Sequence, residues 1–435
     1  MSRAKSIAKN SLAVFVSSNI SKFITLFLTI LIARYLGVED FGKLSFALAF
    51  ASLFSVLVNA GTGILTVRML KEEAHREAKI VGNTIVLRFV NSVLTFIIVA
   101  VIINLMRYPA DTKTAVYIAT AAVIVENIGG ALGSAFQARE QLEAPAAVKV
   151  LRTLLRFAIT LPLLVAGYGF VEVMYAYLLV RILGIAHLLW IYRRKVGKIN
   201  FSPDTRILKA LIKGGIPFAL SGILVEIYFR IDMTMLSIMK GDAEVGLYSA
   251  AYGIIDGLIV VPSAFAAGLL PVAIEYYKKD RQKLIGLYHK SLRYVSMLAF
   301  PLAAGGFVLS NELMTFLYGQ EYAPSGAALK ILIWVLVLLF QVYVMGVVTI
   351  ALKQEKKTVW VLFGNALLNV GLNLALIPRY GMYGAAAATV ISEMFYFTMY
   401  YEIIRRTLTG VPFLKILGKQ AVASALMAAV LLIMP

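Results

Sequence analysis

The sequence has no cysteine, three histidines and few charged residues for its length of 435. Charged residues make up 15% of the chain, while apolar residues make up 60% and the mean hydropathy is +0.83. A soluble domain would not combine so few charges with such long apolar stretches. The histidines are far apart and no metal-ligand spacing occurs, so we expect no cofactor and no metal site. Because there is no cysteine, the sequence does not indicate whether the protein works in an oxidising or a reducing compartment.

Long apolar runs follow one another along the whole chain. About twelve are long enough to cross about 30 Å of hydrocarbon, and a thirteenth lies at the C-terminus. A β-barrel would show alternating segments of about ten residues, and none is present. The loops are too short for an extramembrane catalytic domain, and no Walker-type phosphate loop occurs. The fold class predicted is an all-α polytopic membrane protein with no catalytic residue, so we expect a protein that is not an enzyme.

Acidic residues are scarce: 23 Asp and Glu stand against 42 Lys and Arg, for a net charge of +19. Such a charge first suggests nucleic acid, but its distribution argues otherwise. With the N-terminus inside, about thirty of the basic residues fall at cytoplasmic ends and loops, as the positive-inside rule predicts. No small-residue cleavage site follows the first apolar run, which is therefore an anchor. We expect a multi-pass plasma (inner) membrane protein with a cytoplasmic N-terminus and no nucleic-acid partner.

A repeat relates the two halves of the chain. Gly37-Val-Glu-Asp-Phe-Gly42 returns as Gly241-Asp-Ala-Glu-Val-Gly246, 204 residues later, and each copy lies in a short polar break between apolar runs. Six spans per half is an even number, so both halves enter from the same side and the repeat is parallel, about an axis normal to the membrane. We predict two six-helix bundles, residues 1–205 and 206–405, and an additional C-terminal span in 406–435.

Ionisable residues inside the predicted spans are costly in a bilayer and call for a partner or a water-filled cavity. One interpretation is that they form structural ion pairs between helices. The other is that they line a binding cleft and a gating or ion-coupling path. On the second interpretation the substrate-binding cations are Lys22, Arg88, Lys149, Arg152, Arg156, Arg181 and Arg230, and the gating or coupling carboxylates are Glu126, Glu226, Asp232, Asp256 and Glu393.

Three cations form a ladder on one predicted helix. Lys149, Arg152 and Arg156 are spaced i, i+3 and i+7, which puts them on one face that climbs from the cytoplasm into the bilayer. Topology alone needs only the outermost one or two. A basic ladder suits an anionic headgroup, because guanidinium binds phosphate oxygens bidentately. Arg88 is more ambiguous, since it can also extend back to the inner surface.

The repeat offset pairs Lys22 with Glu226. Equivalent positions in facing bundles lie across the pseudo-twofold axis, so these unlike charges could form a gate. The alternative is that Glu226 pairs with Arg230 on its own helix, at i and i+4.

Three stretches carry a family resemblance. Ala33-Arg-Tyr-Leu-Gly-Val-Glu-Asp-Phe-Gly-Lys-Leu-Ser-Phe-Ala47 and the segment from Arg230 to Tyr252 resemble the polysaccharide-transport branch of the multidrug/oligosaccharidyl-lipid/polysaccharide (MOP) exporter superfamily, as does Phe136-Gln-Ala-Arg-Glu140. The resemblance covers essentially the whole chain. It implies a MATE-like fold, alternating access, a cationic central cavity and the activity of a lipid-linked oligosaccharide flippase.

The resemblance also implies the partners. These are a polyprenyl-(pyro)phosphate-linked oligosaccharide, moved from the cytoplasmic to the outer leaflet for cell-surface polysaccharide or glycan biosynthesis, together with membrane lipids and a coupling ion, H⁺ or Na⁺. We expect a monomer. One alternative is a multidrug/cation antiporter of the same superfamily, which should depend on the carboxylates more than on the cations. A membrane-embedded glycan polymerase is disfavoured, because its large outer loop is missing.

Overall fold

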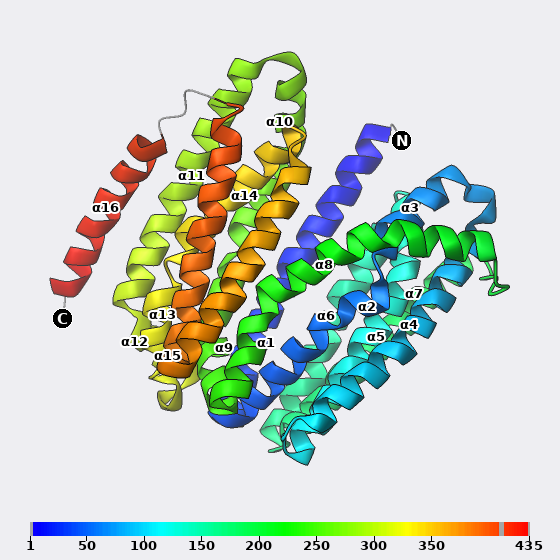
Figure 1. Cartoon of the computed structure of the whole chain (residues 1–435), viewed down its shortest axis with the longest axis horizontal. Helices are drawn as coiled ribbons and strands as arrows, with labels where there is room; N and C mark the ends of the chain where they lie inside the picture. Colours follow the sequence, from blue (N-terminus) through cyan, green and yellow to red (C-terminus); the bar gives the residue numbers. More distant parts are fainter. Residues whose placement is uncertain (1–2, 409–412, 434–435) are drawn as a thin grey trace. The chain divides into compact units, whose positions relative to one another are not determined.

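The computed structural model describes residues 3–408 and 413–433, with side chains from 14 to 408 and from 416 to 433. These described residues form helices and turns and contain no strand. The helices are α1 (Arg3–Leu53), α2 (Ser55–Asn59), α3 (Thr62–Glu72), η1 (Ala74–Arg76), α4 (Glu77–Leu105), α5 (Ala110–Ala138), α6 (Glu143–Val165), α7 (Phe170–Lys195), α8 (Thr205–Lys240), α9 (Asp242–Leu258), α10 (Val260–Lys279), α11 (Arg281–Val308), α12 (Ser310–Tyr318), η2 (Gln320–Tyr322), α13 (Ser325–Leu332), α14 (Val335–Ala351), α15 (Glu355–Arg405) and α16 (Phe413–Ile433) (Figure 1).

The predicted membrane spans are helical in the described residues, but three of them are broken: the second consists of the end of α1, α2 and α3, the eighth of α9 and α10, and the tenth of α13 and α14. Ten helical segments in the described residues are long and apolar enough to cross a membrane. Two of them, 14–72 and 355–405, each contain two predicted spans. The spans follow one another across a short turn, where the backbone leaves the helical conformation at Gly37 and at Gly381. The predicted fifth span corresponds to α6, which carries the basic ladder, and the predicted C-terminal span corresponds to α16.

The repeated glycines adopt one backbone conformation. Gly37 has φ 76° and ψ 177°, and Gly241 has φ 91° and ψ 176°. Residues with a Cβ avoid this region, so glycine suits both turns. In the second copy the Glu244 carboxylate accepts a hydrogen bond of 2.7 Å from the Met382 amide, which holds the turn against the break in α15. The sequence repeat is therefore also a structural repeat at these turns.

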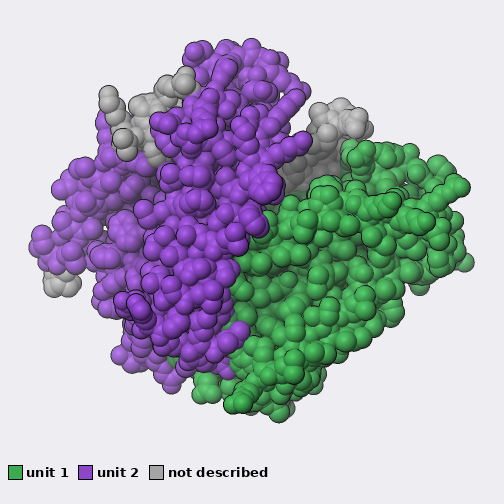
Figure 2. Space-filling view, viewed as in Figure 1, with its two compact units in different colours: residues 1–234 green, residues 235–435 purple. Residues whose placement is uncertain are grey.

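The chain forms two compact units, residues 1–234 and 235–435 (Figure 2). Most of α8 belongs with unit 1, because it crosses the break between α2 and α3 at backbone contact. A Cβ placed on Gly61 would meet the Gly215 carbonyl, and one placed on Gly215 would meet the Ala60 carbonyl. The lobes predicted from the sequence divide the chain at the start of α8 instead, and that assignment stays a prediction.

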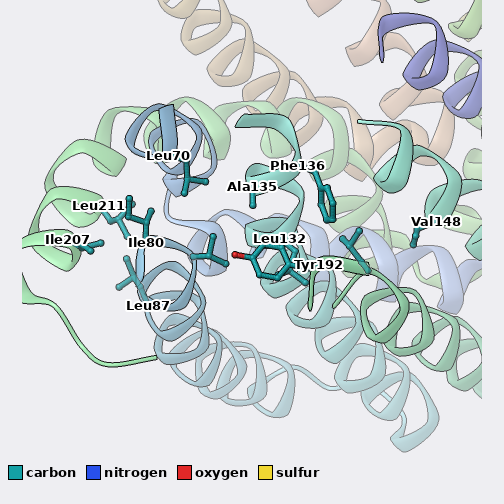
Figure 3. Close-up of a cluster of buried hydrophobic side chains, with 12 residues drawn as sticks. Leu70, Ile80, Leu87, Leu132, Ala135, Phe136, Val148, Tyr192, Ile207 and Leu211 are labelled. Atoms are coloured by element: carbon teal, nitrogen blue, oxygen red, sulfur yellow. The ribbon is translucent and has the colours of Figure 1, made fainter. Parts of the chain in front are cut away.

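Unit 1 has an apolar core at the helix ends predicted to be cytoplasmic. Leu70, Ile80, Leu132, Phe136 and Tyr192 come from four different helices and are nearly inaccessible (Figure 3). Burying such side chains stabilises the unit by about 1.5–3 kcal/mol each. The core fixes one end of α3, α4, α5 and α7, and so sets the spacing of the helices that carry the charges.

The loop before α8 is docked on α4. The Asn83 amide donates to the Ser202 carbonyl at 3.0 Å, and Asn83 Oδ1 accepts from the Asp204 amide at 2.7 Å. The Asp204 carboxylate lies 2.9 Å from Lys79 Nζ and 2.8 Å from Arg76 Nη2. The hydrogen bond from Lys79, together with bonds from the first amides of α8, lowers the pKa of Asp204 to about 2. This loop therefore holds the start of α8 within unit 1.

Candidate functional site

The candidate site is a cluster of charged side chains inside unit 1. It lies where α1, α5, α6 and α7 pack against one another. The structure brings together most of the cations predicted from the sequence with one of the predicted carboxylates: Lys22, Lys149, Arg152, Arg156, Arg181 and Glu126.

Glu126 on α5 lies between two arginines. Its Oε2 atom contacts Nη1 of Arg152 on α6 and Nη1 of Arg181 on α7. The Arg152 stem packs beside Gly184 of α7, where a Cβ would come within 3.0 Å of Arg152 Cδ. The small residue lets the long basic side chain pass between the two helices. The Glu126 side chain is 39% exposed, so the group is paired but not sealed.

Tyr177 on α7 orients the two deeper guanidinium groups. The guanidinium carbon of Arg156 lies 4.7 Å from the centre of the Tyr177 ring, and that of Arg181 lies 4.8 Å from it. Arg181 also donates a hydrogen bond to the Tyr177 hydroxyl. Arginine over an aromatic face is stabilised by the ring quadrupole. Our sequence reasoning missed Tyr177, although its i, i+4 spacing to Arg181 was a usable signal.

The two lysines lie toward the other end of the ladder. Lys149 Nζ is 3.1 Å from the Ser18 hydroxyl of α1, and Lys149 is within electrostatic range of Lys22, Arg152 and Glu126. Ser18 and Lys22 are one helical turn apart, so both can face α6. Lys22 itself is exposed.

The cluster carries an excess of positive charge. Against its five cations, the described contacts supply one carboxylate, that of Glu126. At about 4 Å, two like charges repel by about 4 kcal/mol in a partly hydrated protein environment. The Arg156 Nε atom is buried and has no hydrogen-bond partner among the described residues. Excess cations and a free donor suit the binding of an anion with several oxygens.

Arg88 lies apart from this cluster. It is 2% exposed, so the expectation that it could extend to the membrane surface is wrong. Its guanidinium donates to Thr62 Oγ1 at 3.0 Å, to Asn59 Oδ1 at 3.1 Å and to the Asn127 carbonyl at 2.5 Å. Thr62 and Asn59 flank the break between α2 and α3 and Asn127 lies on α5, and these neutral acceptors explain why the side chain turns inward. Arg88 thus braces this break and α5.

Arg230 lies on α8, with Glu226 one turn before it. Glu226 is within electrostatic range of Arg230 and lies near the Ser55 side chain of α2. The intrahelical pairing considered from the sequence stays a prediction. The gate between Lys22 and Glu226 stays a prediction.

The remaining predicted carboxylates lie outside the cation cluster. Asp232 is buried on α8 and accepts a hydrogen bond of 2.8 Å from the Met233 amide. In unit 2, Asp256 on α9 and Glu393 on α15 both interact electrostatically with Tyr343 of α14.

Unit 2 also contains a buried polar ladder that the sequence reasoning missed. Asn365, Asn369 and Asn373 repeat every four residues on α15. The Asn373 amide donates to Asn369 Oδ1 at 3.0 Å, and the Asn369 amide donates to Ser392 Oγ at 3.1 Å. Three buried amides at helical spacing inside an apolar segment were a readable signal, because an apolar helix has no need of them.

Comparison with known protein families gives two matches. A family model described as "Polysaccharide biosynthesis protein" matches residues 7–277, and one described as "Lipid II flippase MurJ" matches residues 231–435. Among similar proteins, "Probable flippase AglR" of Haloferax volcanii is 26% identical over 211 residues, covering 47% of this chain and 44% of AglR. "Uncharacterized membrane protein EpsK" of Bacillus subtilis is 22% identical over 413 residues, covering 90% of this chain and 81% of EpsK. The match spans less than half the length of AglR and 35% of a second Haloferax volcanii relative, "Probable low-salt glycan biosynthesis flippase Agl15".

Solved structures show the same fold. A lipid II flippase MurJ in an inward closed conformation superposes with a TM-score of 0.81 at 16% identity, covering 97% of this chain and 92% of that one. An inward-facing multidrug resistance MATE family transporter of the MOP superfamily superposes with a TM-score of 0.71 at 17% identity, covering 89% of this chain and 94% of that one. At these identities the likeness concerns the fold, which is the MATE-like fold expected from the sequence.

Proposed function

Because this chain belongs to the polysaccharide biosynthesis protein family, whose model covers residues 7–277, we propose that it is a flippase for a lipid-linked oligosaccharide. The observation that carries the proposal is the cation cluster of unit 1. Five cations around a single carboxylate, among helices of which α1, α5 and α7 are long and apolar enough to cross a membrane, suit a phosphate or diphosphate headgroup better than a cationic drug. The flippase names of several relatives support the same activity, and they describe transporters rather than enzymes.

In the proposed cycle, the cations hold the headgroup while the polyprenyl tail stays in lipid. Two lobes, 1–205 and 206–405, alternate access and carry the glycan from the cytoplasmic to the outer leaflet of the plasma membrane, with the N-terminus in the cytoplasm and the protein working as a monomer. Arg230 extends the cationic surface, and Lys22 and Glu226 act as a gate.

Coupling to H⁺ or Na⁺ is assigned to the carboxylates of unit 2. Asp256 and Glu393 are the candidates, because they interact with the same tyrosine, Tyr343, and lie in the unit that contains the buried asparagine ladder. Protonation or cation binding there would leave the headgroup cations of unit 1 free to hold an anion.

The test is reconstitution in liposomes with a fluorescent undecaprenyl-diphosphate-linked sugar. Translocation is measured as the fraction of label protected from a membrane-impermeant quencher. Losing one partner of a buried charged contact costs about 2–5 kcal/mol, so Arg152→Ala or Arg181→Ala should each slow translocation by about 30-fold or more. Arg181→Lys should keep part of the rate, because the charge survives without the bidentate geometry.

Arg193→Ala is the matched control, since Arg193 lies at the exposed end of the same helix, α7, and should translocate at the wild-type rate. An antiporter would reverse the ranking: Asp256→Asn and Glu393→Gln would abolish ethidium efflux while the arginine variants stayed active. Full translocation of the lipid-linked sugar by the Arg152→Ala/Arg181→Ala double variant would refute the flippase mechanism.

A further inference from the structure

Glu126 occupies the place in the cluster that an anionic ligand would take. One carboxylate oxygen, Oε2, contacts Nη1 of both Arg152 and Arg181. A guanidinium pair bridged by one oxygen is also the arrangement that binds a phosphate oxygen. The Glu126 side chain is 39% exposed, so a ligand can reach it.

The groups around Glu126 are already arranged for a larger anion. The Tyr177 ring lies against Arg156 and Arg181, at 4.7 and 4.8 Å, and so holds both guanidinium groups on one side of the site. Arg156 Nε is buried without a hydrogen-bond partner among the described residues, a donor that Glu126 leaves unused. The site therefore offers more hydrogen-bond donors than the Glu126 carboxylate can accept.

We propose that Glu126 is a built-in competitor of the substrate: its carboxylate holds Arg152 and Arg181 when the site is empty, and a phosphate group of the lipid headgroup displaces it. The inference rests on the proposed function. Phosphate displaces the carboxylate because it offers more oxygen acceptors and, as a diphosphate, brings at least two negative charges to the five cations.

The displaced carboxylate has a second partner in reach. Lys149 is within electrostatic range of Glu126 and makes its described contact with a neutral group, the Ser18 hydroxyl at 3.1 Å. A Glu126 carboxylate displaced from the two arginines therefore keeps a further cation within electrostatic range and does not become an isolated charge, which would be costly in the membrane. When the headgroup leaves, the carboxylate returns and neutralises the arginines, which favours release.

Competition of this kind lowers affinity by a predictable factor. If the carboxylate holds the arginines in about nine molecules out of ten, the apparent dissociation constant is about tenfold higher than that of the open site. Removing the carboxylate charge should recover that factor. A residue that only supports the helix packing would give no gain in affinity when it is changed.

The experiment uses the purified full chain in detergent with two probes, farnesyl diphosphate and inorganic pyrophosphate, measured by isothermal titration calorimetry. Glu126→Gln should bind farnesyl diphosphate about tenfold tighter than the wild type, and should show a lower KM and a lower maximal rate in the liposome assay. Pyrophosphate should show the same ratio, because the competition concerns the phosphate and not the tail. Glu72→Gln is the control, since Glu72 also pairs with an arginine, Arg68, but at the exposed surface, and its affinity should not change.

Each result decides a different question. Equal or weaker binding by Glu126→Gln, with measurable binding by the wild type, overturns the competitor role and leaves the flippase proposal standing. Failure of both proteins to bind either probe overturns the anion site itself, and the competitor role with it. If Glu126→Gln does not fold, Glu126→Asp decides, because its shorter side chain bridges the arginines less well and should bind farnesyl diphosphate severalfold tighter; unchanged affinity would overturn the proposal.

Discussion

The crossing of α8 over the break between α2 and α3 leads to a quantitative prediction for Gly61. Gly61 has φ +67°, a conformation that residues with a Cβ rarely adopt. A Cβ there would meet the Gly215 carbonyl and would also lie 2.7 Å from the Ala219 nitrogen and 2.8 Å from Phe218 Cβ. These neighbours are backbone or Cβ atoms, so α8 itself has to move.

The expected cost of Gly61→Ala combines two unfavourable effects and one favourable effect. The left-handed backbone costs about 1–2 kcal/mol with alanine, and overpacking of a close contact costs about 1–3 kcal/mol. The lower entropy of the unfolded chain offsets about 0.4–1 kcal/mol. The free energy of unfolding should therefore fall by about 1–5 kcal/mol.

Two neighbouring glycines separate these effects. A Cβ on Gly63 would have its nearest neighbours at 3.8 and 3.9 Å, in ordinary contact, so Gly63→Ala in the first turn of α3 should be neutral or stabilise by up to about 1 kcal/mol. Gly215 lies within α8 and has an ordinary helical backbone, so Gly215→Ala would suffer only the steric clash with the Ala60 carbonyl. The stability of Gly215→Ala should therefore lie between those of the other two variants.

Equilibrium unfolding in mixed micelles with increasing SDS, followed by tryptophan fluorescence, measures all three variants against the wild type. The predicted order of stability is Gly63→Ala, then Gly215→Ala, then Gly61→Ala. A Gly61→Ala protein within about 0.5 kcal/mol of the wild type would mean that the crossing relaxes at little cost, since surface substitutions produce changes of that size, and the reasoning about backbone contact would be wrong.

Three further predictions concern charged residues. Arg88→Ala should lower the free energy of unfolding by about 2–4 kcal/mol, through lost hydrogen bonds and a cavity, while pyrophosphate affinity in calorimetry stays unchanged; a selective loss of affinity would place Arg88 in the binding site. The folded-state pKa of Asp204 is lowered to about 2 from 3.8, so its contribution to stability is complete above about pH 4 and is lost as the pH falls toward 2. Thermal unfolding of Asp204→Asn should therefore vary less over that range than that of the wild type, and equal pH dependence would contradict the docking role. Reversing the charge of both Lys22 and Glu226 should restore more transport in the liposome assay than either single reversal, and no advantage of the double change would remove the gate.

Several features could be read from the sequence because local physics decides them. Apolar runs must match the thickness of the hydrocarbon layer, and the runs predicted as spans are helical in the described residues, three of them with a break inside the span. Gly37 and Gly241 take the same positive φ because both turns need a backbone conformation that suits glycine. The i, i+3, i+7 spacing of Lys149, Arg152 and Arg156 fixed their common face once α6 was a helix.

The partners of the charges were decided by tertiary structure. Helical periodicity says which face a residue occupies, but not which helix lies opposite that face. Arg88 and Arg181 are both arginines in apolar segments, yet Arg88 meets neutral acceptors around a helix break and Arg181 meets Glu126 and Tyr177. Glu126 and Arg152 are 26 positions apart and on different helices, so only the packing of α5, α6 and α7 brings them together. The spans, the repeat and the excess of cations could be predicted from the sequence, because they follow from hydropathy, backbone conformation and residue counts. Which cations brace the helices, and which surround a site for an anion, depends on the surface of the neighbouring helix. These roles could therefore be read only from the folded chain.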